Sequence, residues 1–318
     1  MEKIQIKNLY GKTIFECEKE GNTIKDVVEE AVKKSVSLAD ADLSGANLIG
    51  ANLHRARLHG AYLVGANLCD ADLTGADLTG TDLSGANLYG ADLYNAKLTG
   101  ATLYQADLTE ADLVGAYLRG ADLRDANLHG ANLSNADLRV SDLSGANLRN
   151  ANLYNVNLCG ANLIGADLIL ANLHWANLCS ANLCEADLCG AYLHGASLCG
   201  ACLSEANNIP NTSMSCPSEG SFIAWKKIER KLVKLEIPED AKRSSATTTK
   251  CRCDKAKVLA ITDLDGENPI NEIVNSNYAT LTYKVGEMVY PDSFDEDRWN
   301  ECSHGIHFFV DKQEAIDY

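Results

Sequence analysis

The residues with the clearest potential for chemistry lie near the C-terminus of this chain. Cys251-x-Cys253 and Cys302-x-His304-x-x-His307 supply thiol and imidazole groups, which are the ligand types that zinc prefers. Their spacing matches no common zinc finger, and the apolar neighbours of His307 must pack in a core. We therefore interpret these side chains as packed residues of a small domain, and we expect neither a metal nor a cofactor.

Two further motifs invite an enzymatic interpretation. The run from Asp263 to Glu267, DLDGE, places carboxylates as a calcium loop does, but it is shorter than the twelve-residue loop, so a hairpin turn fits better. The final segment, GIHFFVDKQEAIDY, resembles a strand–helix segment of ADP-ribosyltransferases, without a catalytic Glu context or an upstream nicotinamide-binding element. We therefore predict that the chain is not an enzyme.

A strict five-residue repeat dominates the middle of the chain. Leucine occupies every fifth position from Leu38 to Leu203, which makes 34 leucines, and the consensus is A-(D/N)-L-x-x. A period of five fits neither a helix nor a flat strand. It fits a coil in which each pentapeptide forms one side and four sides form one turn. Leu and Ala then fill the interior, and the coils pair like parallel strands roughly 4.8 Å apart.

This segment resembles the pentapeptide-repeat family, and the resemblance covers about half of the chain. It implies the fold of that family, a right-handed quadrilateral β-helix. The best-known members are quinolone-resistance proteins, which resemble duplex DNA in shape and charge and bind type II topoisomerases. Some of those members carry loops that interrupt the repeats, whereas no loop breaks the register here.

The flanking segments have a different composition. In residues 1–37, Ile4 and Ile6 alternate with polar residues, which predicts a β-hairpin, and a helix is predicted to begin at Thr23. We expect this hairpin and helix to cap the apolar end of the stack. The β-helix spans 38–207, a turn-rich linker follows at 208–221, and a small α+β domain occupies 222–318. The expected fold is therefore mainly β, a pentapeptide-repeat solenoid between a cap and a small domain.

Within the C-terminal domain we expect strands from Lys257, over 278–283, over 287–290 and over 305–310. Asp265-Gly266 predicts a hairpin-type turn, and Asp311-Lys-Gln-Glu314 reads as a capping box that opens a short final helix. The stretch VGEMVYPDSFDEDRWNECSHGIHFF resembles a C-terminal domain that accompanies pentapeptide repeats in phage-encoded proteins. That resemblance implies a phage origin.

The chain is acidic, with a net charge of −16, and residues 38–207 hold eighteen acids against seven bases. This charge disfavours direct binding to nucleic acid and suits either a basic partner or mimicry of a polyanion. Asp and Asn also suit the local turn, so a solvated surface explains the same pattern. The candidate acidic face consists of Asp72, Asp77, Asp82, Asp92, Asp107, Asp112 and Asp122.

Residues twenty apart should stack in columns along the β-helix. Cysteines at 159, 179 and 199 form one such column, but a ladder on a flat face cannot close a tetrahedral metal site. Outward positions become apolar late in the array, at Ile164, Ile169, Leu170 and Trp175. Exposed apolar groups of this number are normally covered, so we expect either the C-terminal domain to fold back on them or a partner or second copy to bind there.

Together these observations predict a non-enzymatic protein-binding or scaffold protein, phage-encoded and acting on a host macromolecule as a host-takeover or anti-defence factor. We expect a host protein as partner, no membrane, a homodimer, and, since no signal peptide is visible, the cytoplasm of the bacterial host. Two alternatives remain open. One is an acidic DNA mimic that binds a type II topoisomerase, and the other is a ligand-binding or catalytic C-terminal domain on a repeat scaffold.

Overall fold

The computed structural model describes residues 2–19, 21–209, 216–217, 219–245, 250–275, 281–295 and 304–318. Contacts divide the chain into two compact units, one made of 1–193 and 201–210 and the other of 194–200 and 211–318. Among the described residues, no helix is long and apolar enough to span a membrane.

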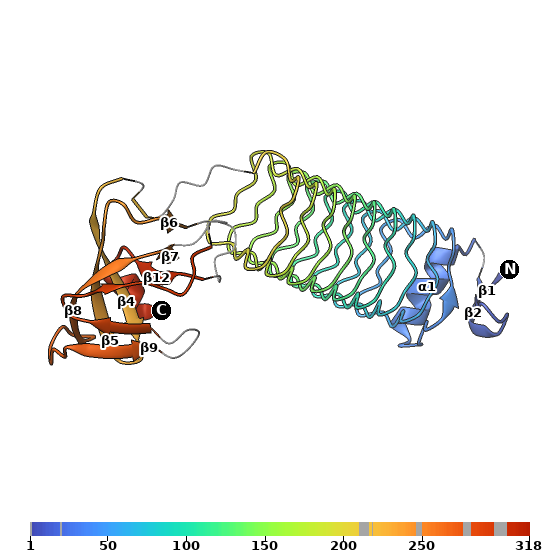
Figure 1. Cartoon of the computed structure of the whole chain (residues 1–318). Helices are drawn as coiled ribbons and strands as arrows, with labels where there is room; N and C mark the ends of the chain where they lie inside the picture. Colours follow the sequence, from blue (N-terminus) through green and yellow to red (C-terminus); the bar gives the residue numbers. More distant parts are fainter. Residues whose placement is uncertain are drawn as a thin grey trace. The chain divides into compact units, whose positions relative to one another are not determined.

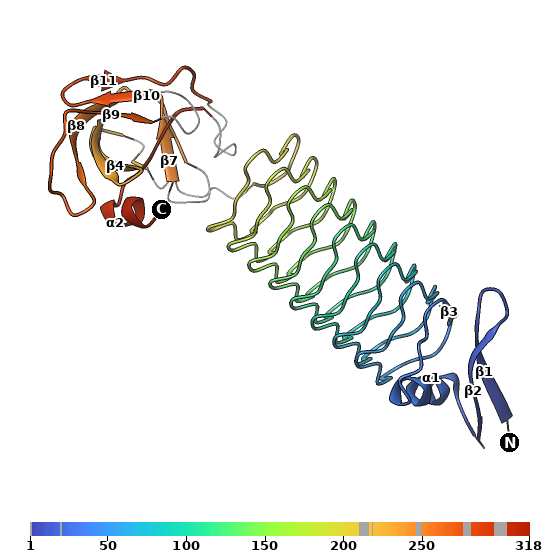
Figure 2. The same cartoon turned by 90° about the horizontal axis from the view of Figure 1, so that it is seen from below.

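The N-terminal cap begins with the predicted hairpin, formed by β1 (Glu2–Asn8) and β2 (Thr13–Lys19). Strand β1 also pairs with β3 (Ala41–Asp42) in the first coil. Helix α1 (Ile24–Lys33) starts at Thr23, where a capping box with Asp26 satisfies backbone groups at both positions. In both views α1 lies across the N-terminal end of the coils (Figures 1 and 2).

Side chains of helix α1 pair with three backbone groups at the outer edge of the first coil. The Glu29 carboxylate accepts a hydrogen bond from the Asn52 N–H at 2.7 Å, and the Lys25 ammonium donates to the Ile49 and Gly50 carbonyls. These backbone groups have no coil before them to pair with, and buried polar groups without partners are costly. The helix therefore replaces a missing coil with side-chain hydrogen bonds.

The β-helix has four sides, as the five-residue period predicts. Pairing joins residues twenty apart, for example Asp122 with Asp142, along the whole stack. In mid-stack the Leu123 N–H donates to the Asp142 carbonyl at 2.7 Å, and the Asp142 N–H donates to the Ala121 carbonyl at 3.0 Å. Leu and Ala are buried in almost every repeat, so the interior is a continuous apolar column.

Each side of the β-helix ends at a corner whose residue has a positive φ. Gly, Asn and Asp hold most of these corners because they adopt the left-handed region at low cost. Leu170 at φ 58° and Trp175 at φ 60° are exceptions, since bulky side chains are rare in this conformation. Both therefore project outward from strained positions.

The C-terminal unit is built on a seven-stranded antiparallel sheet in the order β11-β8-β5-β4-β12-β7-β6. Its strands are β4 (Phe222–Ile228), β5 (Lys231–Ile237), β6 (Arg243–Ser244), β7 (Lys250–Cys253), β8 (Ala256–Asp263), β11 (Met288–Val289) and β12 (Ile306–Phe309). Strands β9 (Glu272–Asn275) and β10 (Leu281–Lys284) form a separate two-stranded sheet.

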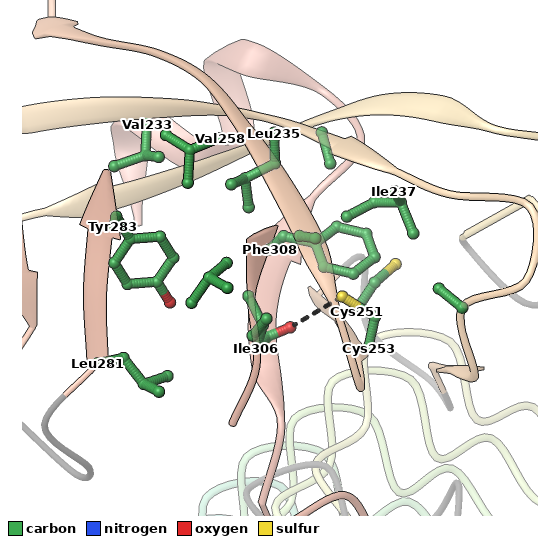
Figure 3. Close-up of a cluster of buried hydrophobic side chains, with 14 of the residues drawn as sticks. Val233, Leu235, Ile237, Cys251, Cys253, Val258, Leu281, Tyr283, Ile306 and Phe308 are labelled. Carbon is green, nitrogen blue, oxygen red and sulfur yellow. Dashed lines mark hydrogen bonds between the residues drawn. The ribbon is translucent and has the colours of Figure 1, made fainter. Parts of the chain in front are cut away.

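One face of the large sheet, together with Leu281 and Tyr283 from β10, encloses the main core of this unit (Figure 3). On the opposite face α2 (Lys312–Asp317) covers a smaller cluster that contains Leu232 and Phe309. The Asp311 carboxylate accepts hydrogen bonds from the Gln313 and Glu314 N–H groups at the start of α2, so the Asp311 half of the predicted capping box is confirmed.

Several strand predictions in this unit need correction. The predicted turn at Asp265-Gly266 forms, and the Asp263 N–H donates to the Glu267 carbonyl across it at 2.8 Å, but β8 and β9, the strands on either side, belong to different sheets. The strand expected over 278–283 is described only from Leu281 onward. The strands expected over 287–290 and 305–310 are present but shorter. Strands β4 and β5, which pair along their full lengths, went unpredicted.

Candidate functional site

The four sides of the β-helix differ in their surfaces, and we number them by where they recur. The first face contains residues 41–45 and the corresponding pentapeptide of each later coil, at intervals of twenty residues, up to 201–205. The second starts at 46–50, the third at 51–55 and the fourth at 36–40 and 56–60, each recurring with the same spacing. Any function of the rod must be assigned to one or more of these faces.

The candidate acidic face does not exist as one surface. Asp72, Asp92 and Asp112 stack on the third face, whereas Asp77 lies on the fourth and Asp107 on the second. The other two, at 82 and 122, lie on the first face. The prediction of a single face was wrong because it took seven outward carboxylates together without assigning each to a column.

All seven of these carboxylates have a local structural role. Each accepts a hydrogen bond from the backbone N–H two residues later, at 2.9 to 3.3 Å. Asn132 and Asn152 make the same contact with their amide oxygens. The turn therefore explains why Asp or Asn stands before most of the repeat leucines, and the negative charge is an additional property.

Charge is distributed unevenly around the rod. The first face carries seven acids and one base, the second five acids and one base, and the third three acids and one base. The fourth carries three acids and four bases, which are Arg57, Lys97, Arg119 and Arg139. Arg139 also pairs with Asp137 at 2.6 Å and lowers the pKa of that carboxyl. The rod is therefore most acidic on its first and second faces, less acidic on the third, and slightly basic on the fourth.

The candidate apolar surface is also split between faces. Ile164 lies on the first face, Ile169 and Leu170 on the second, and Trp175 on the third, all within one coil. Ile169 is half-buried, while Leu170 is 48% exposed and Trp175 is 54% exposed. These residues lie on three of the four faces, so they cannot all contact one flat partner surface.

A more compact aromatic surface lies on the third face. The rings of His174 and Tyr192 stack with centroids 5.9 Å apart and an interplanar angle of 17°. Tyr154 stands one coil before His174 in the same column, and Trp175 is the corner residue next to His174. We call Tyr154, His174, Trp175 and Tyr192 the aromatic cluster, and its tyrosines and tryptophan are all exposed.

The third face thus has two different ends. Its first coils carry the stacked Asp72, Asp92 and Asp112, and its last coils carry the aromatic cluster. Uncharged Asn132 and Asn152 fill the same column between them. Sequence reasoning missed the cluster, because its members are 18 or 20 residues apart. The 18-residue spacing recurs in other side-chain contacts, such as Ser134 with Asn152 at 2.8 Å.

The candidate metal ligands of the C-terminal unit that the structure describes are not brought together. Cys251 and Cys253 point into the core from β7, and the Cys253 thiol contacts the Ile306 carbonyl at 3.9 Å (Figure 3). His307 lies between Ile306 and Phe308 on β12, so alternation places its side chain on the opposite face of the sheet. His304 is exposed, and Cys302 lies outside the described residues.

Burial raises the pKa of the Cys253 thiol to about 12. The hydrogen bond with Cys216, followed by burial, raises that of Cys251. Both side chains thus favour the neutral thiol, which is typical of a cysteine packed in a core. Across the described ranges, no three His, Cys, Asp or Glu side chains lie close enough together to hold a metal ion.

The acidic turn after β8 is engaged within its own domain. The Asp263 carboxylate pairs with the Lys231 ammonium at 2.6 Å and accepts a hydrogen bond from the Asn268 amide at 2.7 Å. The Asp265 carboxylate accepts from the Glu267 N–H. These contacts are those of a closed turn between strands.

The stacked coils, with pentapeptide sides and a Leu column at the axis, define a β-helical solenoid. The family model for pentapeptide repeats matches residues 37–75, 66–105, 101–139, 141–178 and 171–207, which together span more than half of the chain. The chain therefore belongs to the pentapeptide-repeat family. A second model, a family of unknown function (DUF5758), matches residues 212–315. No curated protein matches the chain.

The chain is also similar to several solved structures. HetL from the cyanobacterium Nostoc sp. strain PCC 7120, involved in regulating heterocyst differentiation, is 39% identical, covering 54% of this chain and 86% of its own, with a TM-score of 0.35. QnrB1, a plasmid-mediated fluoroquinolone resistance protein, is 24% identical, covering 51% and 87%, with a TM-score of 0.35. A thylakoid-lumen protein from Arabidopsis thaliana is 35% identical, covering 33% and 66%, with a TM-score of 0.17.

Proposed function

We propose that this chain is a non-enzymatic protein-binding scaffold whose third face contacts a partner protein. The observation that carries the proposal is the aromatic cluster, in which Trp175 and Tyr192 are each 54% exposed. Tyr and Trp are the residues that dominate binding energy at protein interfaces, since they bury large areas with few rotatable bonds.

The rod also presents this cluster in a pre-organised form. Backbone hydrogen bonds hold each coil on both sides, and the stack with His174 fixes the ring of Tyr192. Binding to a rigid surface loses little conformational entropy, so a small patch can bind well. Asp72, Asp92 and Asp112 at the other end of the face favour a partner that is basic where it meets them.

The repeat itself supplies variants that test this proposal without disturbing the fold. Trp175→Gly places the usual corner residue at a positive φ, and Tyr192→Asn restores the residue found twenty positions earlier. Tyr104→Ser, which matches Ser84 and Ser144 in its own column, removes an exposed ring from the first face and serves as the control.

The assay is capture of host proteins on the immobilised full-length chain, compared between these variants by quantitative mass spectrometry. We expect the double variant W175G/Y192N to bind the specifically captured protein at least tenfold more weakly, which corresponds to a loss of roughly 1.4 kcal/mol in binding free energy. The control variant should retain it. Equal capture by all three proteins would contradict the proposal.

The sequence resemblance of the C-terminal segment extends the proposal to a phage-encoded protein that acts on a host macromolecule in the bacterial cytoplasm. This extension rests on that resemblance alone. Identification of a bacterial host protein as the captured partner would support it, and failure to bind any protein of a bacterial host would count against it.

One observation favours a second candidate function, mimicry of DNA toward a type II topoisomerase. The first and second faces together carry twelve acids and two bases, so one half of the rod presents a polyanionic surface. Such a surface predicts competition with duplex DNA for a basic groove and a steep loss of affinity with salt. Topoisomerase binding that resists both would argue against mimicry.

A further inference from the structure

Two cysteines lie in adjacent coils on the first face, near the C-terminal end of the β-helix. The Cys202 N–H donates to the Ala181 carbonyl at 2.9 Å, and the Leu183 N–H donates to the Cys202 carbonyl at 2.8 Å. These bonds place Cys202 directly opposite Asn182, and Cys184 follows two residues after Asn182. The Cys184 N–H donates to the Asn182 side-chain oxygen at 3.2 Å, so the backbone fixes both cysteines.

Cys184 and Cys202 are 18 residues apart, and this spacing brings outward side chains into contact elsewhere in the rod. It joins Thr109 with Asn127, Ser134 with Asn152, Arg149 with Asp167 and the ring of His174 with that of Tyr192. In the same way the Cys184 thiol donates a hydrogen bond to the Cys202 sulfur. The close approach of the two sulfur atoms therefore follows from the geometry of the coils.

Cys202 occupies the position at which Asp or Asn accepts the N–H two residues later in other repeats. Asp122 and Asp142 stand in the same column and accept this bond through their carboxylates. Here the hydrogen bond from Cys184, followed by that from the Ser204 N–H, lowers the pKa of the Cys202 thiol. A turn that elsewhere holds a carboxylate thus favours a thiolate, and Cys202 is exposed to reagents in solution while Cys184 is half-buried.

Cys202 also lies in the part of the stack that is held least firmly. Among the described residues, the bridges between coils end at Asn207, so the coil of Cys202 is the last one. Leu203 is only half-buried, whereas Leu163 and Leu183 in the same column are fully buried. A segment with fewer buried contacts opens more readily than the interior of a stack. A covalent bond between these coils would oppose that opening.

We propose that Cys184 and Cys202 form a reversible disulfide, with a small-molecule disulfide such as oxidised glutathione as the oxidant. The Cys202 thiolate attacks one sulfur of the oxidant, the S–S bond of the oxidant breaks, and one glutathione leaves as a thiolate and takes up a proton. Cys184 then loses its proton to water, and its sulfur attacks the Cys202 sulfur and releases the second glutathione. The two protein thiols lose two electrons and two protons, and the oxidant is reduced to two thiols.

The test incubates the full-length protein in mixtures of oxidised and reduced glutathione, traps free thiols with N-ethylmaleimide and maps the peptides by mass spectrometry. Cleavage after Glu185 separates the two cysteines, so a disulfide between them appears as a linked pair of peptides. We expect this pair in the unsubstituted protein and in Cys189→Ser, a control that removes an exposed thiol from the second face.

The linked pair should be absent from Cys184→Ser and from Cys202→Asn. Both substitutions introduce residues that the rod already holds in the same columns, Ser144 and Asn182, so the fold should be kept and the melting temperature of the reduced protein should stay the same. Failure to find the pair at any glutathione ratio, or its persistence in Cys184→Ser, would overturn the proposal.

The disulfide should also slow hydrogen exchange in residues 201–207 by about tenfold or more, because it restricts the opening of the last coil. Reduction with dithiothreitol should restore the original rate, and the N-terminal coils should not change. The oxidant should have no such effect on Cys184→Ser. Equal exchange rates for 201–207 in the reduced and oxidised forms would overturn the inference that the bond holds this coil in place.

Discussion

Shortening Leu123 tests whether the apolar column holds the rod together. This side chain is fully buried in mid-stack, and its neighbours in the column, Leu103 and Leu143, are equally buried. Leu→Ala at such a site loses the transfer free energy of the removed carbons and leaves a cavity, a cost of about 3 kcal/mol. Leu123→Asp should cost several kcal/mol more, because it buries a charge without a partner.

The effect should be local as well as large. Each coil contacts only the coils before and after it, so a defect weakens its own rung and its neighbours. We expect hydrogen exchange measured by mass spectrometry to accelerate between residues 103 and 143 and to change least at the N-terminal coils. His129→Ala changes an outward side chain in the same region and should shift stability by less than about 0.5 kcal/mol.

An unchanged melting temperature in Leu123→Asp would refute the reasoning, because it would mean that this position does not face the interior. Uniform loss of protection along the whole rod would refute the local part of the argument. In that case the repeats would unfold as one cooperative unit.

Four further outcomes are expected. Burial lowers the pKa of Lys226 to about 8, so between pH 8 and its ordinary value of 10.5 the unfolded chain holds more protons, and the C-terminal domain should gain stability as pH rises through that window. Lys226→Met should remove this pH dependence. Equal urea-unfolding midpoints at neutral and alkaline pH in the unsubstituted protein would contradict the reasoning. Chelator should leave the melting temperature unchanged and elemental analysis should find no stoichiometric zinc; one zinc per chain would show that the candidate cysteines and histidines bind metal. Light scattering at micromolar concentration should give the mass of a dimer, since twofold pairing is the commonest homo-oligomer, and a monomer mass would exclude it. Finally, if the aromatic cluster is a partner surface, the fluorescence of Trp175 should be that of a water-exposed indole both in the full chain and in a chain ending at Asn207. Protection of the late coils from hydrogen exchange in the full chain alone would instead support fold-back of the C-terminal domain.

The β-helix could be predicted from sequence because its rule is local and repeats without a break. One period fixes the buried Leu and Ala, the turn-forming Asp or Asn and the corner residue of every repeat. The hairpin and α1 were predictable for similar reasons, since alternation at Ile4 and Ile6 and the cap at Thr23 are short-range signals. The same signals located the short strands near 288 and 306.

The order of the C-terminal sheet could not be predicted in this way. Strand β12 pairs with β4 at Trp225 and Phe309, which are far apart in sequence, and lies between β4 and β7. Nothing in a local pattern specifies such a neighbour. The ammonium of Lys226 donates to the His307 carbonyl at 3.0 Å across this junction, yet the sequence shows only another basic residue in a basic run.

The acidic and apolar surfaces of the β-helix were predicted incorrectly for a related reason. Their residues were grouped by chemical type, whereas the fold distributes them among columns on different faces. Trp175 was identified, but its neighbours Tyr154 and Tyr192 were not, because adjacency across coils requires the 18- and 20-residue spacings to be applied to every outward side chain.

Pairing between residues twenty apart has a consequence for how this rod can change in length. The face on which a side chain lies depends on how many pentapeptides precede it, and the same face recurs after every four pentapeptides. Deleting one pentapeptide, such as 116–120, would keep the Leu column continuous but rotate every later residue by a quarter turn about the axis. The aromatic cluster would then continue the second face and lose its alignment with Asp72, Asp92 and Asp112. Removal of a whole coil would shorten the rod and preserve that alignment, so the angular phase between two surface patches can vary independently of the core.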